Sequence, residues 1–144
     1  MKFTYVNPTV IHFGQGQINA ISQAVDTSKK VLVIYGGGSI KSNGVYDQVV
    51  ASLKDHAWIE FAGVEANPTK ETLDKAVALV KEENVEFIIA VGGGSVIDGS
   101  KYVAAAAKYD GDGWDILAGK HQVTEATPIG AVLTLPATGS ESNM

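Results

Sequence analysis

The sequence predicts an α/β fold, a Rossmann-like, doubly wound and mostly parallel sheet with flanking helices. Strand-like and helix-like segments alternate along the chain, which is typical of βαβ units. Several strand-like segments are continuous apolar runs, such as residues 30–35, which suit strands buried on both faces, as in a parallel sheet. We therefore expect residues 1–144 to form one α/β domain.

The first half of the chain contains three predicted strands. Residues 10–13 are expected to form a short strand that ends at Gly14, followed by a weak helical stripe over residues 18–25. The apolar run at 30–35 is the second strand, and a helix is expected from about 44 to 54. The third strand is predicted at 58–61.

The second half repeats the alternation of helix and strand. Thr69 is expected to cap a helix in which Leu73, Val77 and Val80 recur at helical spacing. The remaining elements are predicted as a strand at 87–91, a helix at 96–108 and a last strand at 130–135.

Composition limits the classes of protein. The 144 residues are 45% hydrophobic and 19% charged, with net charge −5, so one domain with a real core is expected. The acidic balance argues against nucleic-acid binding, and no apolar run reaches the ~18 residues of a membrane span. There is no cysteine and no signal-peptide pattern at the N-terminus, so disulfides and thiolate metal sites are excluded and a cytoplasmic location is expected.

The glycine-rich segment 92–101 is the strongest functional signal. It follows an apolar strand and precedes an alanine-rich helix, so three glycines leave the turn open to a ligand next to a helix N-terminus. Such a turn suits an anion such as a pyrophosphate. A structural alternative is that Ser95 and Asp98 form a capping box, which explains the serine and aspartate but not three consecutive glycines.

Three further polar or glycine-containing segments also follow predicted strands, at 36–39, 67–69 and 134–143. Ligands of doubly wound sheets bind at the carboxyl ends of the strands, near a reversal of strand order. The four segments are therefore expected to converge on one edge of the sheet and to form a nucleotide site there.

The chain does not match three common nucleotide- or metal-binding motifs. The dinucleotide fingerprint G-x-G-x-x-G fails because Ile97 and Lys41 stand where its last glycine belongs. A kinase or ATPase phosphate loop fails because Ser100 and Lys101 are in the wrong order and Asp98 would repel a triphosphate. The three histidines, His12, His56 and His121, are too far apart for a metal site and are expected to be ordinary surface or loop residues.

Taken together, the segments resemble the iron-containing (group III) alcohol dehydrogenase family. The resemblance is carried by Asn7-Pro8-Thr9, His12-Phe13-Gly14, Tyr35-Gly36-Gly37-Gly38-Ser39, Asn67-Pro68-Thr69, Gly92 to Lys101, and Leu133 to Asn143. The branch that this chain resembles contains NADPH-dependent aldehyde reductases and butanol dehydrogenases. The resemblance implies that residues 1–144 are the N-terminal dinucleotide-binding domain of a truncated protein. A helical second half, absent from residues 1–144, would hold a divalent metal (Fe or Zn) through one Asp and three His.

The resemblance also implies roles for individual residues. The pyrophosphate would lie at Gly93, Gly94, Ser95 and Asp98. The adenosine half would lie near Gly36, Gly37, Ser39 and Asn67. The ribose and nicotinamide side of the cofactor would be lined by Thr134, Thr138 and Asn143. No catalytic residue and no metal ligand is expected within this chain, so residues 1–144 alone are expected to be inactive.

The implied reaction is hydride transfer between NADP(H) and an alcohol or aldehyde, with the metal as Lewis acid. NADP(H) is expected over NAD(H) because NAD-preferring members of the family carry an Asp in the loop after residues 31–35, and here that loop is Gly36-Gly37-Gly38-Ser39, beside Lys41. We also expect an exposed apolar surface and a homodimer or higher oligomer.

Three alternatives stay open at this point. The chain could be a stand-alone nucleotide-binding module without catalysis. It could belong to an enzyme like glycerol dehydrogenase or dehydroquinate synthase. It could be an α/β domain that acts through its surface.

Overall fold

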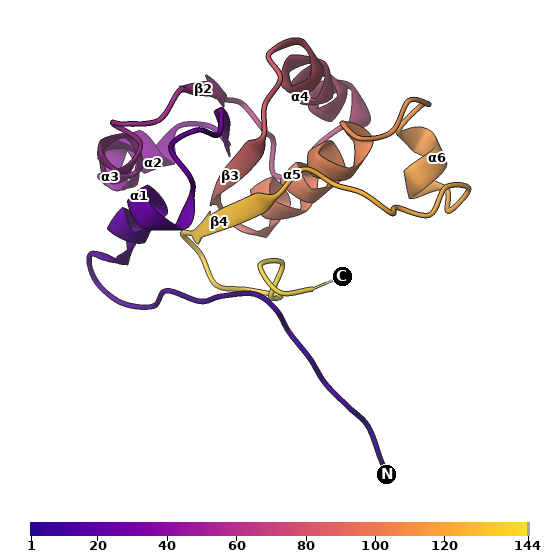
Figure 1. The fold of residues 1–144 in the computed structure, drawn as a ribbon, viewed down its shortest axis with the longest axis horizontal. Coiled ribbons are helices and arrows are strands. Elements are labelled where there is room, and N and C mark those ends of the chain that lie inside the picture. The colour runs from indigo at the N-terminus through magenta and orange to yellow at the C-terminus, as the bar shows by residue number, and fades with distance from the viewer. Residues whose placement is uncertain (144) are drawn as a thin grey trace.

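The computed structural model describes residues 1–143 and has one four-stranded sheet at its centre (Figure 1). Its strands are β1 (Val31–Tyr35), β2 (Trp58–Phe61), β3 (Phe87–Gly92) and β4 (Ile129–Leu133). They lie in the order β2-β1-β3-β4, and every neighbouring pair is parallel. The predicted α/β fold with a parallel sheet is therefore confirmed.

Helices cover both faces of this sheet. They are η1 (Gln17–Ala20), α1 (Ile21–Ala24), α2 (Ser39–Ser42), α3 (Val45–Ser52), α4 (Lys70–Glu82), α5 (Gly94–Ala106) and α6 (Trp114–Leu117). In Figure 1, α1, α2 and α3 lie on one side of the strands and α4, α5 and α6 on the other. The chain runs from β1 outward to β2, returns to β3 and continues outward to β4, so the strand order reverses between β1 and β3.

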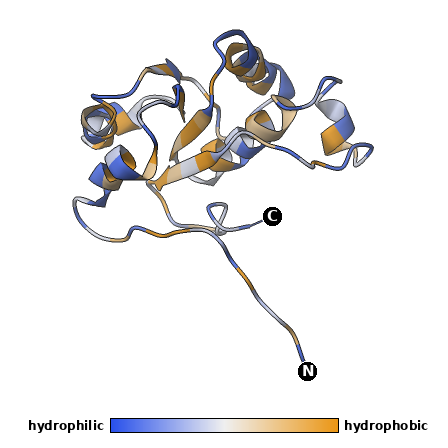
Figure 2. Cartoon of the chain, in the orientation of Figure 1, coloured by the Kyte–Doolittle hydropathy of each residue, from blue (hydrophilic) through white to orange (hydrophobic). Residues whose placement is uncertain are grey.

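The strands are buried because both of their faces are covered. Every residue of β1 is buried, and its side chains alternate between two apolar clusters, as the pleat of a strand requires. Leu32 and Ile34 face α4 and α5, whereas Val33 and Tyr35 face α2 and α3. Figure 2 shows the result, with apolar strands inside and hydrophilic outer faces on the helices.

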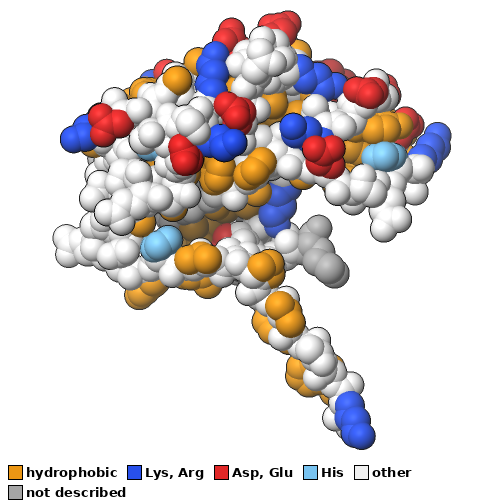
Figure 3. Space-filling model, in the orientation of Figure 1, with side chains coloured by type: hydrophobic (Ala, Val, Ile, Leu, Met, Phe, Trp, Pro, Cys, Tyr) orange, Lys and Arg blue, Asp and Glu red, His pale blue; other side chains and the backbone are white. Residues whose placement is uncertain are grey.

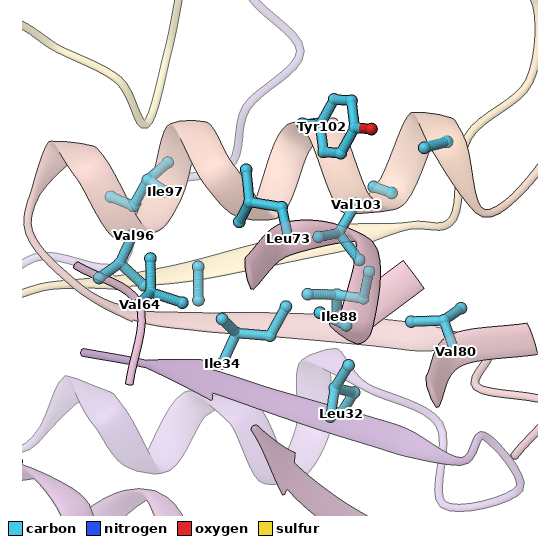
Figure 4. Close-up of a cluster of buried hydrophobic side chains, with 14 of the residues drawn as sticks. Leu32, Ile34, Val64, Leu73, Val80, Ile88, Val96, Ile97, Tyr102 and Val103 are labelled. Atoms are coloured by element: carbon cyan, nitrogen blue, oxygen red, sulfur yellow. The ribbon is translucent and has the colours of Figure 1, made fainter. Parts of the chain in front are cut away.

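The packing of α5 on α4 and the sheet fixes the position of the glycine turn. Val96 and Val103 of α5, Leu73 of α4 and Ile34 of β1 belong to one buried cluster, in which they point toward one another (Figure 4). Gly99 lets the two helices approach, because a Cβ there would lie 2.9 Å from Leu73 Cδ2. The N-terminus of α5 is thereby held at the carboxyl edge of the sheet.

Most element boundaries agree with the expectations from sequence. Residues 58–61 match β2, and Thr69 caps α4 as predicted, since its Oγ1 accepts a hydrogen bond from the Thr72 N–H at 3.3 Å. The short helices α2 and α6 were not predicted, α5 begins two residues earlier than expected, and β4 ends at Leu133 rather than at residue 135.

The predicted strand at residues 10–13 is wrong. Residues 1–13 contain no helix or strand and leave the body of the molecule as an arm, along which hydrophobic side chains are exposed (Figure 3). Val10, Ile11 and Phe13 are between 69 and 93% exposed. An apolar run forms a strand only when its N–H and C=O groups find a partner, and none of the strands in this sheet pairs with residues 10–13. The expectation of exposed apolar surface agrees with this arm.

His56 lies in a loop, as expected, but it is buried, and its Nε2 lies 2.7 Å from the Val25 carbonyl oxygen. It packs between the end of α1 and the start of β2. Within residues 1–143, none of the helices is both long enough and apolar enough to span a bilayer.

Candidate nucleotide-binding site

The candidate site is the edge of the sheet where β1, β3 and β4 end. Because the strands are parallel, the segments that follow them leave the sheet at the same edge. Backbone hydrogen bonds connect them there: the Gly63 N–H donates to the Gly36 carbonyl at 3.0 Å, and the Thr134 N–H donates to the Gly92 carbonyl at 3.0 Å. The reversal of strand order between β1 and β3 lies at this edge, where doubly wound sheets bind ligands.

The turn after β3 requires glycine. Gly92 has φ of +154°, and a Cβ there would lie 2.9 Å from Val96 Cγ2. Gly93 is the N-cap of α5 and provides no side-chain cap. The first hydrogen bond of the helix joins the Ile97 N–H to the Gly93 carbonyl at 3.2 Å, so the N–H groups of the first three helical residues have no partner inside the helix. These groups and the dipole of a 13-residue helix favour an anion at this position.

Ser95 and Asp98 do not form the capping box that was the structural alternative to a ligand site. The helix begins at Gly94, so Ser95 already lies inside its first turn, and its hydroxyl donates to the Ala66 carbonyl. Asp98 is the fifth helical residue, and its side chain is exposed. The Ser95 contact ties the N-terminus of α5 to the segment that carries Asn67, which brings the loop between β2 and α4 to the same edge.

The segment after β4 is attached to α5 at two places. Lys101 Nζ donates to the Asn143 carbonyl oxygen at 3.0 Å and also to Asn143 Oδ1. Ser140 is 2% exposed, and its Oγ, which has no hydrogen-bond partner, lies 3.1 Å from the position that a Cβ on Gly94 would take. Ser140 was not predicted from the sequence, because only its contact with α5 distinguishes it from the other serines of this segment.

The loop after β1 is open where a ligand would approach it. A Cβ on Gly36 would lie 3.1 Å from the Val64 carbonyl oxygen, whereas a Cβ on Gly37 would have no atom within 4 Å. Gly38 has φ of +100° and is followed by Ser39, the exposed first residue of α2. The loop thus offers backbone N–H groups and one hydroxyl, with no carboxylate of its own.

The sequence-predicted residues fall into two groups at this edge. The first group, around the start of α5, contains Gly93, Gly94, Ser95 and Asn67, which the contacts above join directly or through the adjacent residue. Asn143 instead contacts Lys101, about two turns further along α5. The second group, at the end of the neighbouring strand β1, contains Gly36, Gly37 and Ser39. The side chains of Thr134 and Thr138 are exposed on the segment after β4, and Asp98 lies one turn further along α5.

The two residue groups fit a dinucleotide. A pyrophosphate needs free N–H groups, and the first turn of α5 offers them. The adjacent strand end offers an open glycine loop for a ribose. A divalent metal does not fit the described residues, because residues 1–143 contain no group of three or more His, Cys, Asp or Glu side chains placed to hold one.

Two shallow hollows lie elsewhere, near the C-terminal end of α5. They measure about 180 and 220 Å³, and their walls include Tyr109 and His121 in one and Lys70 and Asp112 in the other. None of the glycines of the turn at 92–94 lines either hollow. The chemistry of the carboxyl edge therefore makes it the candidate site.

Comparison with protein families gives a match over residues 8–144, to the family described as "Iron-containing alcohol dehydrogenase". The probable NADH-dependent butanol dehydrogenase 1 of Bacillus subtilis (strain 168) is 55% identical over 99% of this chain and 38% of that protein. The NADPH-dependent aldehyde reductase YqhD of Escherichia coli (strain K12) is 51% identical over 99% of this chain and 38% of that protein.

Solved structures agree with the fold. The crystal structure of NADH-dependent butanol dehydrogenase A from Thermotoga maritima superposes with a TM-score of 0.95 and 51% identity, over 99% of this chain and 37% of that chain. The chain thus spans less than two fifths of the length of these relatives.

Proposed function

This chain belongs to the iron-containing alcohol dehydrogenase family, and we propose that it is the cofactor-binding part of an NAD(P)H-dependent oxidoreductase that interconverts alcohols and aldehydes. The observation that carries the proposal is the glycine turn between β3 and α5, with its free N–H groups at the reversal of strand order. The relatives named above, a butanol dehydrogenase and an aldehyde reductase, support the substrate class. The alternative of a binding module without catalysis is not favoured by these relatives.

We propose the following arrangement of the cofactor. The pyrophosphate lies against Gly93, Gly94 and Ser95, with Asp98 one turn further along the helix. The adenosine half lies toward the end of β1, against Gly36, Gly37 and Ser39, with Asn67 beside it. The nicotinamide half lies under the segment after β4, near Thr134, Thr138 and Asn143.

In this arrangement the chain's own contribution is to bind and orient. A bound reduced nicotinamide supplies a hydride to the carbonyl carbon of the substrate. The N–H groups of α5 would donate hydrogen bonds to the pyrophosphate, and the segment after β4 would hold the nicotinamide half. The proposed metal, iron or zinc, would be held by residues outside 1–143 and would act as a Lewis acid on the substrate oxygen.

The length of the relatives supports a proposal about domains. They are more than twice as long as this chain, so we propose that residues 1–144 form the N-terminal cofactor domain of a longer enzyme. We further propose that the enzyme is cytoplasmic and forms a homodimer or a higher oligomer. Its exposed apolar residues 10–13 support association. Residues 1–144 alone should lack reductase activity.

We propose NADP(H) as the preferred cofactor. Dehydrogenases that prefer NAD commonly place an Asp or Glu against the ribose 2′-hydroxyl. Here the loop at 36–39 has no carboxylate and leaves open space beside Gly37. The names of the relatives include both NADH-dependent and NADPH-dependent enzymes, so the proposal depends on the chemistry of this loop.

Gly37→Asp in the intact protein tests the proposal. An aspartate fits, because a Cβ at residue 37 meets no atom within 4 Å. It should weaken NADPH binding by about tenfold or more through repulsion of the 2′-phosphate, and leave NADH binding unchanged or tighter. Gly37→Asn is the matched uncharged control and should change NADPH binding much less. A wild-type preference for NADH, or an unmoved preference in Gly37→Asp, would contradict this reading of the loop.

A further inference from the structure

A cluster of charged and phenolic side chains lies directly behind the loop at 36–39. It consists of Tyr35 at the end of β1, Lys41 on α2, Tyr46 on α3 and Glu60 on β2. These four residues come from four elements, and only the fold brings them together. The sequence singled out only Lys41 among them, as a residue near the loop, and Tyr35 directly precedes that loop.

Two hydroxyls satisfy a single carboxylate oxygen in this cluster. The Tyr35 hydroxyl donates to Glu60 Oε2 at 2.9 Å, and the Tyr46 hydroxyl donates to the same oxygen at 3.0 Å. The two rings meet edge to face with centroids 5.8 Å apart. Burial, and then the bond to Glu60, raise the pKa of the Tyr46 phenol, so this hydroxyl remains a donor at neutral pH.

The same two rings hold the lysine. Lys41 Nζ lies 5.5 Å from the centroid of the Tyr35 ring and 4.9 Å from that of Tyr46, within the range of cation–π attraction. The Tyr35 hydroxyl raises the pKa of Lys41 above its ordinary value, which keeps the ammonium charged. The backbone N–H of Lys41 also donates to the Gly38 carbonyl at 3.0 Å, so lysine and loop are parts of one turn.

The cluster sets the charge that an anion meets at the loop. A free carboxylate close to the end of β1 would repel a phosphate and would accept a hydrogen bond from a ribose hydroxyl, as the acidic residues of NAD-preferring enzymes do. Here two phenols donate to one oxygen of Glu60, and the Lys41 ammonium lies over the rings of the same two phenols. The Glu60 carboxylate is therefore hydrogen-bonded rather than free, and a cation is held beside the tyrosines that bind it.

We propose that the cluster of Tyr35, Lys41, Tyr46 and Glu60 determines the cofactor preference, by fixing the Lys41 ammonium for the ribose 2′-phosphate and by masking the Glu60 carboxylate. This proposal rests on the proposed function, in which the loop at 36–39 lies at the adenosine ribose. Lys41 is the residue that touches the phosphate, whereas the two tyrosines and Glu60 are positioning residues.

The experiment measures the dissociation constants of NADPH and NADH for variants of the intact protein. Lys41→Met should weaken NADPH binding by about tenfold, the value of a hydrogen bond to a charged group, and leave NADH unchanged. It should also reduce the salt dependence of NADPH binding, which loss of a merely structural contact would not do. Lys54→Met is the matched control, because this exposed lysine lies before β2, at the opposite end of the strand from the loop, and its loss changes the net charge equally.

Tyr46→Phe and Glu60→Gln together test whether the tyrosine hydroxyls mask the Glu60 carboxylate. Tyr46→Phe releases one hydrogen bond from Glu60 and should weaken NADPH binding by about threefold relative to NADH. In a Glu60→Gln background the same change should have no effect on the preference, because no carboxylate remains to be masked. A structural defect would instead weaken both cofactors together and would persist in the Glu60→Gln background, which would overturn the masking role.

The outcomes separate this proposal from the one on which it rests. If Gly37→Asp shifts the cofactor preference but Lys41→Met and Tyr46→Phe do not, the loop contacts the ribose but the cluster does not determine the preference between NADPH and NADH. If Gly37→Asp also leaves the preference unmoved, the proposed position of the ribose is itself wrong.

Discussion

Replacing Gly94 with alanine tests the contact between the start of α5 and the segment after β4. The new Cβ would lie 3.1 Å from Ser140 Oγ, closer than an ordinary van der Waals contact. Ser140 is 2% exposed, so its hydroxyl has no solvent to move into. The new methyl group in Gly94→Ala would therefore point at Ser140. We expect this variant to weaken cofactor binding by displacing the segment after β4.

The size of the effect follows from two opposing terms. Overpacking a buried contact costs about 1–3 kcal/mol. Alanine also favours the helix over glycine, which raises the free energy of unfolding by up to about 1 kcal/mol. Gly94→Ala should therefore lower the free energy of unfolding by between about zero and 3 kcal/mol. Gly94→Val, with two more methyl groups in the same space, should lose more and should weaken NADPH binding further.

Ser140→Ala removes the clashing atom. The nearest remaining atom of residue 140 would be its Cβ, at 3.9 Å, which is an ordinary contact. Gly94→Ala should then be neutral or stabilising in the Ser140→Ala background, with a coupling free energy of about 1–3 kcal/mol. Urea unfolding of the four proteins, together with their NADPH dissociation constants, completes the cycle. Additivity within about 0.5 kcal/mol would refute the contact.

Two further predictions concern packing and pH. Gly99→Ala should lower the free energy of unfolding by about 1–3 kcal/mol, because its Cβ would lie 2.9 Å from Leu73 Cδ2; an unchanged urea midpoint would contradict the close approach of α4 and α5. Burial, and then the 2.7 Å hydrogen bond to Asp74, raise the pKa of Tyr102 from 10.0 to about 12. The stabilisation from this phenol is therefore complete below pH 10 and lost as the pH rises toward 12. Urea unfolding across this range should show a shallower fall in Tyr102→Phe than in wild type, and equal slopes would contradict the assignment.

The strands of the sheet could be predicted from the sequence because a strand buried on both faces is a continuous run of apolar residues. Residues 31–35 are buried on both faces and are accordingly a continuous apolar run. The run at 10–13 has a similar composition but no neighbouring strand, and strand pairing is a contact between distant residues that composition does not reveal. The same pattern thus succeeds at 31–35 and fails at 10–13 because only the first run has strands beside it.

In the candidate site, too, some features could be predicted from the sequence and others depend on contacts between distant residues. The glycines at 92–94 could be recognised from sequence, since a turn between a buried strand and a helix needs them. The capping box at Ser95 could not be distinguished from its alternative, because the hydroxyl is satisfied by a carbonyl 29 residues away. Lys41 could be singled out from its place next to the loop, but its contacts with two tyrosine rings could not. The contact of Ser140 likewise joins separate elements, and the roles proposed for Thr134 and Thr138 remain predictions.

The most direct test of the central claim is backbone hydrogen exchange of the intact protein with and without saturating NADPH. We predict slower exchange in three separate segments, residues 36–39, 92–96 and 134–143, because all three contact one dinucleotide at the carboxyl edge of the sheet. We predict no change in residues 109–125, which lie around the hollows at the far end of α5. Protection confined to 109–125, or unchanged exchange at 92–96 in the presence of bound NADPH, would contradict the claim.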